Sequence, residues 1–237
     1  MEKEFYKKLK SKTLNDIACG KITYDKLDNI LRADKEVVLE AIRHESFVYY
    51  DVPENLKNDR EIVLASLKKY GLMLEFVSDE LKKDREIVFT AVKQCGFALK
   101  YADQIFKEDK EIVFEAIKSD GWALQFVGRK FLRDPNFLFS AVKYHGYAFE
   151  LLSRKYKRDK NFIEKCIKEH GYVLRFIDPK LRLNYLFLEK LVKINGYCLK
   201  YIPDVFKNDL NLAILAVKQN GLSINFVEGN LRNNKEI

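Results

Sequence analysis

Apolar residues recur along most of the chain in a pattern that restarts every 25 residues. With Asp84 as position 0, the copy DREIVFTAVKQCGFALKYA has apolar residues at positions 3, 4, 7 and 8. Intervals of three and four residues place side chains on one face of a helix, whereas a strand would alternate them. The copies begin at residues 34, 59, 84, 109, 134, 159, 184 and 209, without an insertion. The pattern therefore predicts eight tandem helical repeats over residues 34–233.

Each repeat also indicates where its first helix begins and ends. The Asp or Asn at position 0 can accept hydrogen bonds from the free amides of the first turn, so it predicts an N-cap. Seven copies have Gly at position 12, and the first copy has Ser46 there. A left-handed glycine would end a helix of about eleven residues and bring position 13 against position 8. Apolar residues at positions 15, 17, 18 and 22 then predict a second helix of about two turns.

The predicted helices are too short to be stable alone, because isolated helices below about twelve residues are marginal in water. The copies must therefore stack on their neighbours, which predicts an all-α fold, an α-solenoid of about eight helical-hairpin repeats. Residues 1–33 keep a helical periodicity but leave the 25-residue register, so we expect an N-terminal helical cap there. Residues 234–237 resemble the start of a truncated ninth repeat.

The repeat resembles a known helical-repeat family, domain of unknown function 4116. Residues 84–102 (DREIVFTAVKQCGFALKYA) and residues 209–227 (DLNLAILAVKQNGLSINFV) are similar to its unit DREIVLAAVKQNGLALKYA. The resemblance covers about 200 of the 237 residues. Such arrays are known chiefly from bacteria and include secreted effectors of intracellular pathogens, so the resemblance implies a bacterial effector or inhibitor. It implies no activity and no catalytic residue.

Composition adds expectations about compartment and partners. The 43 Lys and Arg residues exceed the 35 Asp and Glu residues, which gives a formal charge of +8. No apolar run approaches the roughly 20 residues that cross a bilayer, and the amino terminus lacks the apolar segment of a Sec signal. The four widely spaced cysteines favour reduced thiols. We expect a monomer without a membrane span, in the cytoplasm or delivered to a host cytosol by a non-Sec route.

Cations recur at two positions of the repeat. Position 9 is expected to face solvent and holds Arg43, Lys68, Lys93, Lys118, Lys143, Lys168, Lys193 and Lys218. This stripe could follow a phosphate backbone or an acidic protein. Its place in the last helical turn equally suits contacts with the open carbonyls of the helix end. A second column at position 23 faces the acidic caps and is typical of an ordinary solvated rim.

The fifth to seventh repeats differ from the others by combining cations, imidazoles and aromatic rings near the turn after the first helix. Such a mixture is typical of a protein-binding hot spot or of a platform on which bases stack. The alternative is that the aromatic residues at position 13 only close the helix end. The candidate binding residues are Trp122, Lys143, His145, Tyr147, Lys168, His170, Tyr172, Lys193 and Tyr197.

Two other sets of residues could carry chemistry, but each has a simpler interpretation. Position 11 holds Cys95, Asp120, His145 and His170, yet layers about 8 to 10 Å apart would let at most two of them share a metal. We therefore predict no metal site and no cofactor. Glu164 and Glu189 could form an acid/base pair, but each has a lysine four residues on, Lys168 and Lys193, which favours salt bridges.

No sequence motif of a known enzyme class is present. We therefore expect a non-catalytic scaffold that binds a macromolecular partner, in the first place a protein. Binding of nucleic acid, or inhibition of a nucleic-acid-processing complex, is the alternative interpretation of the basic and aromatic positions.

Overall fold

A computed structural model describes residues 2–45 and 47–237 of the chain, so Ser46 lies outside the described residues. The chain divides into two compact parts, which we call the N-terminal block (up to Phe126) and the C-terminal block (from Val127). Within the described ranges all regular structure is helical and no strand occurs. The predicted all-α repeat architecture is therefore confirmed.

The N-terminal block begins with a long helix, and three-part repeats follow it. Each repeat has a ten-residue α-helix, a 3-10 helix and usually a short third turn. The helices are α1 (Glu2–Ala18), η1 (Tyr24–Lys26), α2 (Asn29–Arg32), α3 (Lys35–His44), η2 (Val48–Asp51), α4 (Glu54–Lys57), α5 (Arg60–Lys69), η3 (Gly71–Phe76), η4 (Leu81–Lys83), α6 (Arg85–Gln94), η5 (Gly96–Tyr101), α7 (Gln104–Lys107), α8 (Lys110–Ser119) and η6 (Gly121–Gln125).

The C-terminal block has the same order of elements in each repeat. Its helices are η7 (Phe131–Arg133), α9 (Pro135–Tyr144), η8 (Gly146–Leu151), α10 (Arg154–Arg158), α11 (Lys160–Glu169), η9 (Gly171–Phe176), α12 (Pro179–Arg182), α13 (Tyr185–Ile194), η10 (Gly196–Tyr201), η11 (Asp204–Phe206), α14 (Leu210–Gln219), η12 (Gly221–Phe226) and η13 (Gly229–Asn233).

The long helices begin where the sequence predicts. The Asp84 carboxylate accepts hydrogen bonds from the amides of Glu86 and Ile87, and the side chain of Asn184 accepts one from Phe187. The same N-cap occurs before each of the eight ten-residue helices from α3 to α14. An oxygen side chain at this position satisfies amides that have no partner inside the helix.

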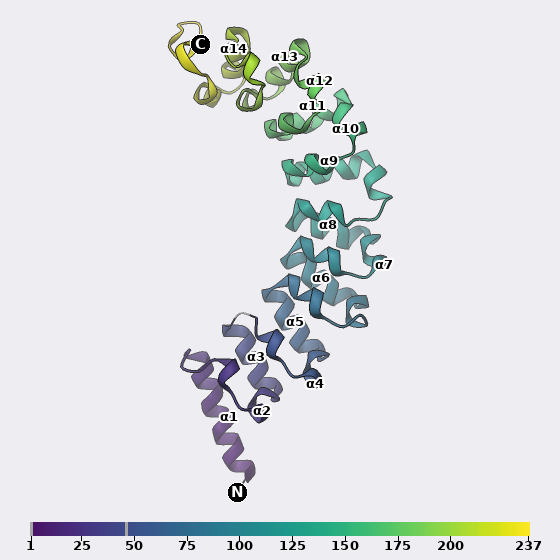
Figure 1. Ribbon diagram of the computed structural model, residues 1–237, viewed down its shortest axis with the longest axis vertical. Helices are drawn as coiled ribbons and strands as arrows, with labels where there is room; N and C mark the ends of the chain where they lie inside the picture. Colours follow the sequence, from purple (N-terminus) through teal and green to yellow (C-terminus); the bar gives the residue numbers. More distant parts are fainter. Residues whose placement is uncertain (1, 46) are drawn as a thin grey trace. The chain divides into compact units, whose positions relative to one another are not determined.

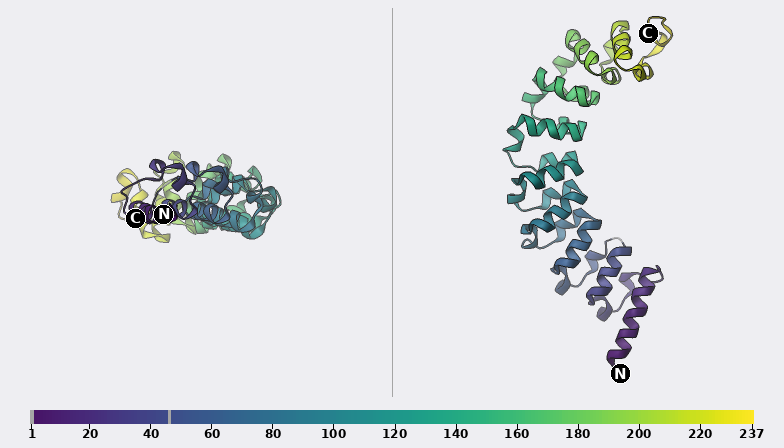
Figure 2. Two further views of the ribbon diagram at one scale, coloured as in Figure 1. Left: turned by 90° about the horizontal axis from the view of Figure 1, so that it is seen from below. Right: turned by 180° about the vertical axis from the view of Figure 1, so that it is seen from behind.

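Within each block the repeats pack in two layers (Figure 1). In the N-terminal block α1, α3, α5, α6 and α8 pack in sequence, and η3, η5 and η6 form the second layer. In the C-terminal block α9, α11, α13 and α14 pack in sequence beside a layer of η8, η9, η10 and η12. The short helices α4 and α7 lie along one edge of their block, as the view from behind also shows (Figure 2). The core lies between the layers, at positions 3, 4, 7 and 8 of the long helices and positions 14, 15 and 18 beyond them.

The predicted role of glycine at position 12 is wrong. Gly20 and Gly229 are the glycines with positive φ among the described residues, and neither lies at position 12. In the seven repeats with a glycine there, position 12 is instead the first residue of the 3-10 helix that follows the long helix. A Cβ atom on Gly96 would lie 2.0 Å from the carbonyl oxygen of Ala116, and one on Gly71 would lie 2.3 Å from that of Ala91. At these two positions glycine is needed because the following repeat comes too close for a side chain.

The predicted second helix also differs from the structure. It is a 3-10 helix of about six residues, and the short third turn after it makes each repeat more than a hairpin. Ala98, Leu99 and Ala102 are buried, whereas Tyr101 at position 17 is half-exposed. The sequence pattern groups position 17 with the apolar positions 15 and 18 of the second helix, and the structure separates it from them. Ala102 already lies beyond the 3-10 helix, in extended backbone, so positions 17 and 18 do not share a helical face.

Side chains of the next repeat cap the ends of the long helices. The Gln94 side chain accepts a hydrogen bond from the Gly71 amide (2.5 Å) and donates one to the Lys69 carbonyl (3.0 Å). Lys69 itself donates to the carbonyls of Ile42, Arg43 and Glu45 at 3.0 to 3.1 Å. The open carbonyls at these helix ends are therefore satisfied by position 10 of the following repeat.

Ionic clamps join the other ends of the helices in the N-terminal block. The Lys35 ammonium lies 2.9 Å from both the Asp59 and the Glu61 carboxylates of the next repeat. Arg60 binds Asp84 and Glu86 in the same way, and Arg85 binds Asp109 and Glu111. Lys10 of α1 binds Asp34 and Glu36, so the N-terminal helix repeats the contact made by the array itself.

Candidate binding surfaces

The nine candidate residues predicted from the sequence are divided between the blocks. Trp122 lies in η6 of the N-terminal block and the other eight lie in the C-terminal block. Lys143, Lys168 and Lys193 are exposed in the last turns of α9, α11 and α13. His145 and His170 occupy the following turns, and Tyr147, Tyr172 and Tyr197 are in the first turns of η8, η9 and η10.

Tyr172 and Tyr197, both at position 13, pack against aromatic rings at position 17. The ring of Tyr172 lies 5.0 Å from that of Phe176 and 5.3 Å from that of Tyr201 in the next repeat, and Tyr197 lies 5.0 Å from Phe226. These edge-to-face contacts link one repeat to the next. We call this surface the aromatic edge of the C-terminal block; it comprises Tyr147, Tyr172, Phe176, Tyr197, Tyr201 and Phe226.

The aromatic edge combines half-exposed rings with polar groups. The Lys200 ammonium lies 5.6 Å from the ring of Tyr201 and 5.5 Å from that of Phe226. Neither Tyr172 nor Tyr197 forms a hydrogen bond through its hydroxyl within the described part of the chain. The surface can therefore offer apolar ring faces, hydroxyl groups and a cation to a partner.

Sequence reasoning missed the position-17 members of this surface because it grouped them with positions 15 and 18 as the apolar residues of the second helix. The signal was present: position 13 and position 17 are both aromatic in several copies, at a spacing of four residues. In the structure both positions are at least partly exposed in these copies.

The histidines have structural contacts. Nε2 of His170 lies 3.0 Å from the Lys143 carbonyl oxygen, to which it donates. The His170 side chain also lies about 3.0 Å from where a Cβ atom of Gly146 would be. The ring of His145 lies 5.3 Å from that of Tyr147. His170 therefore joins two repeats, and the described residues contain no group of three or more side chains that could hold a metal ion.

The two unusual carboxylates at position 5 are paired with lysines. Glu189 binds Lys193 at 2.7 Å, as predicted. Glu164 binds Lys190 of the next repeat at 2.6 Å, so the predicted bridge to Lys168 is wrong. The stacking of α11 beside α13 brings position 6 of the later helix within reach of Glu164.

Position 9 is exposed in all eight repeats, as predicted, but its cations differ in their partners. Arg43 binds Glu40 at 2.7 Å, and Lys143 lies 3.8 Å from Glu169. Four of these lysines have neither a carboxylate partner nor a hydrogen bond inside residues 2–45 and 47–237: Lys68, Lys93, Lys168 and Lys218.

The buried thiols are poor candidates for chemistry. Cys166 and Cys198 are both fully buried and free. Burial raises the pKa of the Cys166 thiol to about 12 and raises the pKa of Cys198 further above its ordinary range. Because the thiolate is the nucleophile and the metal ligand, both groups are inert in the folded chain.

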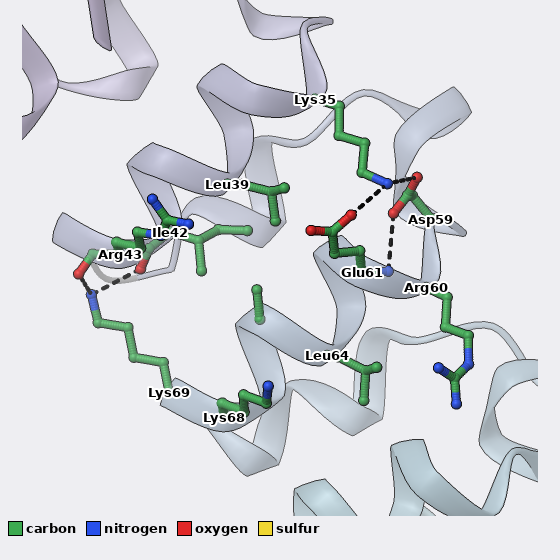
Figure 3. Close-up of a pocket in the computed structure, with 11 residues that line it drawn as sticks. Lys35, Leu39, Ile42, Arg43, Asp59, Arg60, Glu61, Leu64, Lys68 and Lys69 are labelled. Atoms are coloured by element: carbon green, nitrogen blue, oxygen red, sulfur yellow. Dashed lines mark hydrogen bonds and ion pairs between the residues drawn. The ribbon is translucent and has the colours of Figure 1, made fainter. Parts of the chain in front are cut away.

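The N-terminal block has an open groove between α3 and α5 (Figure 3). Its volume is about 850 Å³, and Leu39 and Leu64 project into it. The clamp of Lys35, Asp59 and Glu61 lies at one end, and Arg43, Lys68 and Lys69 lie at the other. Sequence reasoning noted position 9 but did not connect it with the apolar residues of position 5.

A further aromatic cluster lies in the first two repeats. Phe47, Tyr50 and Phe76 are exposed by 55, 48 and 48 %, and Tyr50 packs edge-on against Phe76 at 4.8 Å. Phe47 has a left-handed backbone, with a φ of 66°. Phe47 and Phe76 occupy positions 13 and 17, as the members of the aromatic edge of the C-terminal block do, whereas Tyr50 occupies position 16.

Comparison with known proteins identifies a family. The sequence model of the family described as "Domain of unknown function (DUF4116)" matches residues 34–82, 84–133, 134–182 and 184–232. No curated protein and no solved structure matches the chain. Among its described helices, none is long and apolar enough to cross a membrane.

Proposed function

We propose that this chain, which belongs to the DUF4116 family, is a non-catalytic scaffold that binds a partner protein through the aromatic edge of its C-terminal block. The observation that carries the proposal is the contact of Tyr172 with both Phe176 and Tyr201, which makes the half-exposed rings continuous from one repeat to the next. Rigid aromatic side chains bury a large area at a low entropic cost, and they dominate protein-binding hot spots.

The side chains that could carry out chemistry already have structural contacts or are buried, which favours a binding role. His170 is bonded to a main-chain carbonyl, Glu164 and Glu189 are paired with lysines, and Cys166 and Cys198 are buried. A nucleophile or general base needs an accessible group whose pKa suits proton transfer. The proposal is therefore that these side chains stabilise the repeats and that the exposed rings carry the function.

The bacterial proteins that the repeat resembles suggest the setting. We propose that the chain acts as an effector or inhibitor in a cytoplasm, either that of the producing cell or that of a host. The partner is expected to present apolar side chains to the rings and carboxylates to Lys200 and the nearby lysines of position 9.

Nucleic acid is the second candidate partner. Lys168 and Lys218 are exposed without a carboxylate partner in the described part of the chain. The tyrosines offer ring faces on which bases could stack. Binding through phosphates would weaken steeply with salt, whereas an apolar protein interface would not. Gel-shift measurements with RNA and single-stranded DNA at 50 and 200 mM salt distinguish the two candidates.

The proposed function is tested by capturing a partner on the immobilised chain, identifying it by mass spectrometry and titrating the purified partner in calorimetry. Replacing Tyr172 and Tyr197 together by alanine is expected to weaken binding at least tenfold while circular dichroism stays helical. Leu186→Ala is the control, because Leu186 is exposed by 76 % at the opposite end of α13 from Lys193. Equal affinity of the double variant and the control would contradict the proposal.

A further inference from the structure

The groove between α3 and α5 has an apolar floor that continues along the N-terminal block. Leu39 and Leu64 occupy position 5 in consecutive repeats and are only half-buried. Phe89 has the same position in α6 and the same partial exposure. A neighbouring hollow of about 520 Å³, between α1 and α3, shares Lys35, Leu39 and Glu61 with the groove. The floor therefore presents one apolar side chain per repeat.

The charges around the groove are unbalanced. Five cationic and two anionic side chains line it. At one end the Asp59 and Glu61 carboxylates are both bound by Lys35. At the other end the exposed Lys68 has no partner within the described ranges, and neither does Lys93 of the next repeat. The uncompensated charge beside the apolar floor is therefore positive.

Corresponding positions in the C-terminal block are different. Position 5 is a carboxylate in two consecutive repeats, Glu164 and Glu189, and these side chains bind Lys190 and Lys193. In these two repeats position 5 is charged, and neighbouring lysines neutralise that charge. The combination of an apolar position 5 with uncompensated cations therefore does not occur in them.

We propose that the groove of the N-terminal block binds an acidic, extended segment of a partner protein. Apolar side chains of the segment lie over Leu39, Leu64 and Phe89, and its carboxylates meet Lys68 and Lys93. The acidic character follows from the excess of cations around the groove. This site is in a different block from the aromatic edge, so it adds a second surface to the proposed function.

The spacing of the repeats suggests the conformation of the segment. Packed helices are about 8 to 10 Å apart, so the position-5 side chains recur at about that interval. A polyproline II helix rises about 9.3 Å in its three-residue turn and presents every third side chain on the same edge. A segment with this conformation could place one apolar residue on each repeat and one acidic residue toward the lysines.

A fluorescein-labelled peptide of five Leu-Pro-Glu units is a direct probe, with binding measured by anisotropy against the full chain. We expect saturable binding that weakens as salt is raised, because the charges are exposed. Combining Lys68→Glu with Lys93→Glu should weaken binding at least tenfold. The matched control combines Lys165→Glu with Lys180→Glu, which reverses two exposed lysines of the C-terminal block outside both proposed surfaces; it should leave the affinity unchanged.

Two further peptides test the chemistry of the segment. Five Leu-Pro-Lys units and five Ser-Pro-Glu units should each bind at least tenfold more weakly, since the first has the wrong charge and the second lacks apolar side chains. Absence of saturable binding by the Leu-Pro-Glu peptide would overturn the proposal, as would equal effects of the two double variants. Displacement of the peptide by a single-stranded oligothymidylate that itself depends on Lys68 and Lys93 would overturn the assignment to a protein segment.

The proposal for the groove and the proposal for the aromatic edge can be refuted separately. The Tyr172→Ala and Tyr197→Ala double variant is expected to bind the Leu-Pro-Glu peptide as the unaltered chain does. If the peptide does not bind but the tyrosine variant still loses its captured partner, the groove proposal alone is refuted.

Discussion

Glycine at position 12 shows how strongly a single residue depends on the neighbouring repeat. A Cβ atom on Gly96 would meet the main chain of Ala116, whereas one on Gly221 would have nothing within 4 Å. Gly96→Ala is therefore expected to lower the free energy of unfolding by about 1 to 3 kcal/mol through overpacking. Gly221→Ala should leave it unchanged or raise it by up to about 1 kcal/mol by restricting the unfolded chain.

Urea denaturation followed by circular dichroism measures both glycine variants. The two substitutions are chemically identical, so their difference isolates the close approach between repeats. Equal losses of stability would show that the backbone conformation, and not the neighbouring carbonyl, requires glycine.

The cysteines give a second prediction at the scale of the residue. Cys19 is exposed, whereas burial keeps the pKa of Cys166 near 12 and Cys198 is fully inaccessible. In the folded chain at pH 8, a disulfide reagent is expected to modify Cys19 rapidly and to leave Cys166 and Cys198 unmodified. Mass spectrometry of peptides from the labelled chain checks this, and denaturant should make all four thiols reactive. Rapid labelling of Cys198 without denaturant would contradict the burial.

At the scale of the element, the ionic clamps give the N-terminal block a dependence on pH. The Arg60 guanidinium and the amides of Ile87 and Glu86 hold the pKa of the Asp84 carboxyl below its ordinary value of 3.8, although partial burial acts in the opposite direction. A lowered pKa in the folded state stabilises the fold above the ordinary pKa. That stability is lost as the pH falls through the folded pKa.

Asp84→Asn tests this contribution because asparagine can still cap the helix but does not titrate. The variant is expected to unfold at a lower urea concentration than the unaltered chain at pH 6, and the two midpoints should converge as the pH approaches 2.5. A difference that stays constant between pH 6 and pH 2.5 would mean that the charge of Asp84 does not contribute.

At the scale of the whole molecule, stacked repeats derive their stability from their nearest neighbours. A Cβ atom on Gly196 would lie 2.4 Å from the Ala216 carbonyl oxygen, so Gly196→Ala should loosen the packing of η10 against α14. Hydrogen exchange is expected to accelerate at least several-fold in α13 and α14 and to stay unchanged in α5 and α6. Mass spectrometry of proteolytic fragments measures this, and uniform acceleration throughout both blocks would indicate one cooperative unit instead.

Much of the fold could be predicted from sequence because its determinants are local. Asp84 caps the helix that begins beside it, and Ile87, Val88, Ala91 and Val92 form the buried face through their spacing alone. The exposure of position 9 follows from the same helical geometry. The candidate tyrosines were found because they recur in register, whereas Phe176, Tyr201 and Phe226 were missed because position 17 was grouped with the apolar positions of the second helix.

Contacts between repeats join residues about 20 to 28 positions apart, and only the tertiary structure decides them. The offset of neighbouring helices determines that Gly96 meets Ala116, that Lys35 clamps Asp59 and Glu61, and that Glu164 binds Lys190 and not Lys168. It also places Leu39 and Leu64 side by side in the groove that Lys68 lines. The sequence by itself determined the period, the caps and the buried face, because hydrogen bonds and side-chain periodicity within a helix are local. The stacking of one repeat on the next created the groove and the aromatic edge.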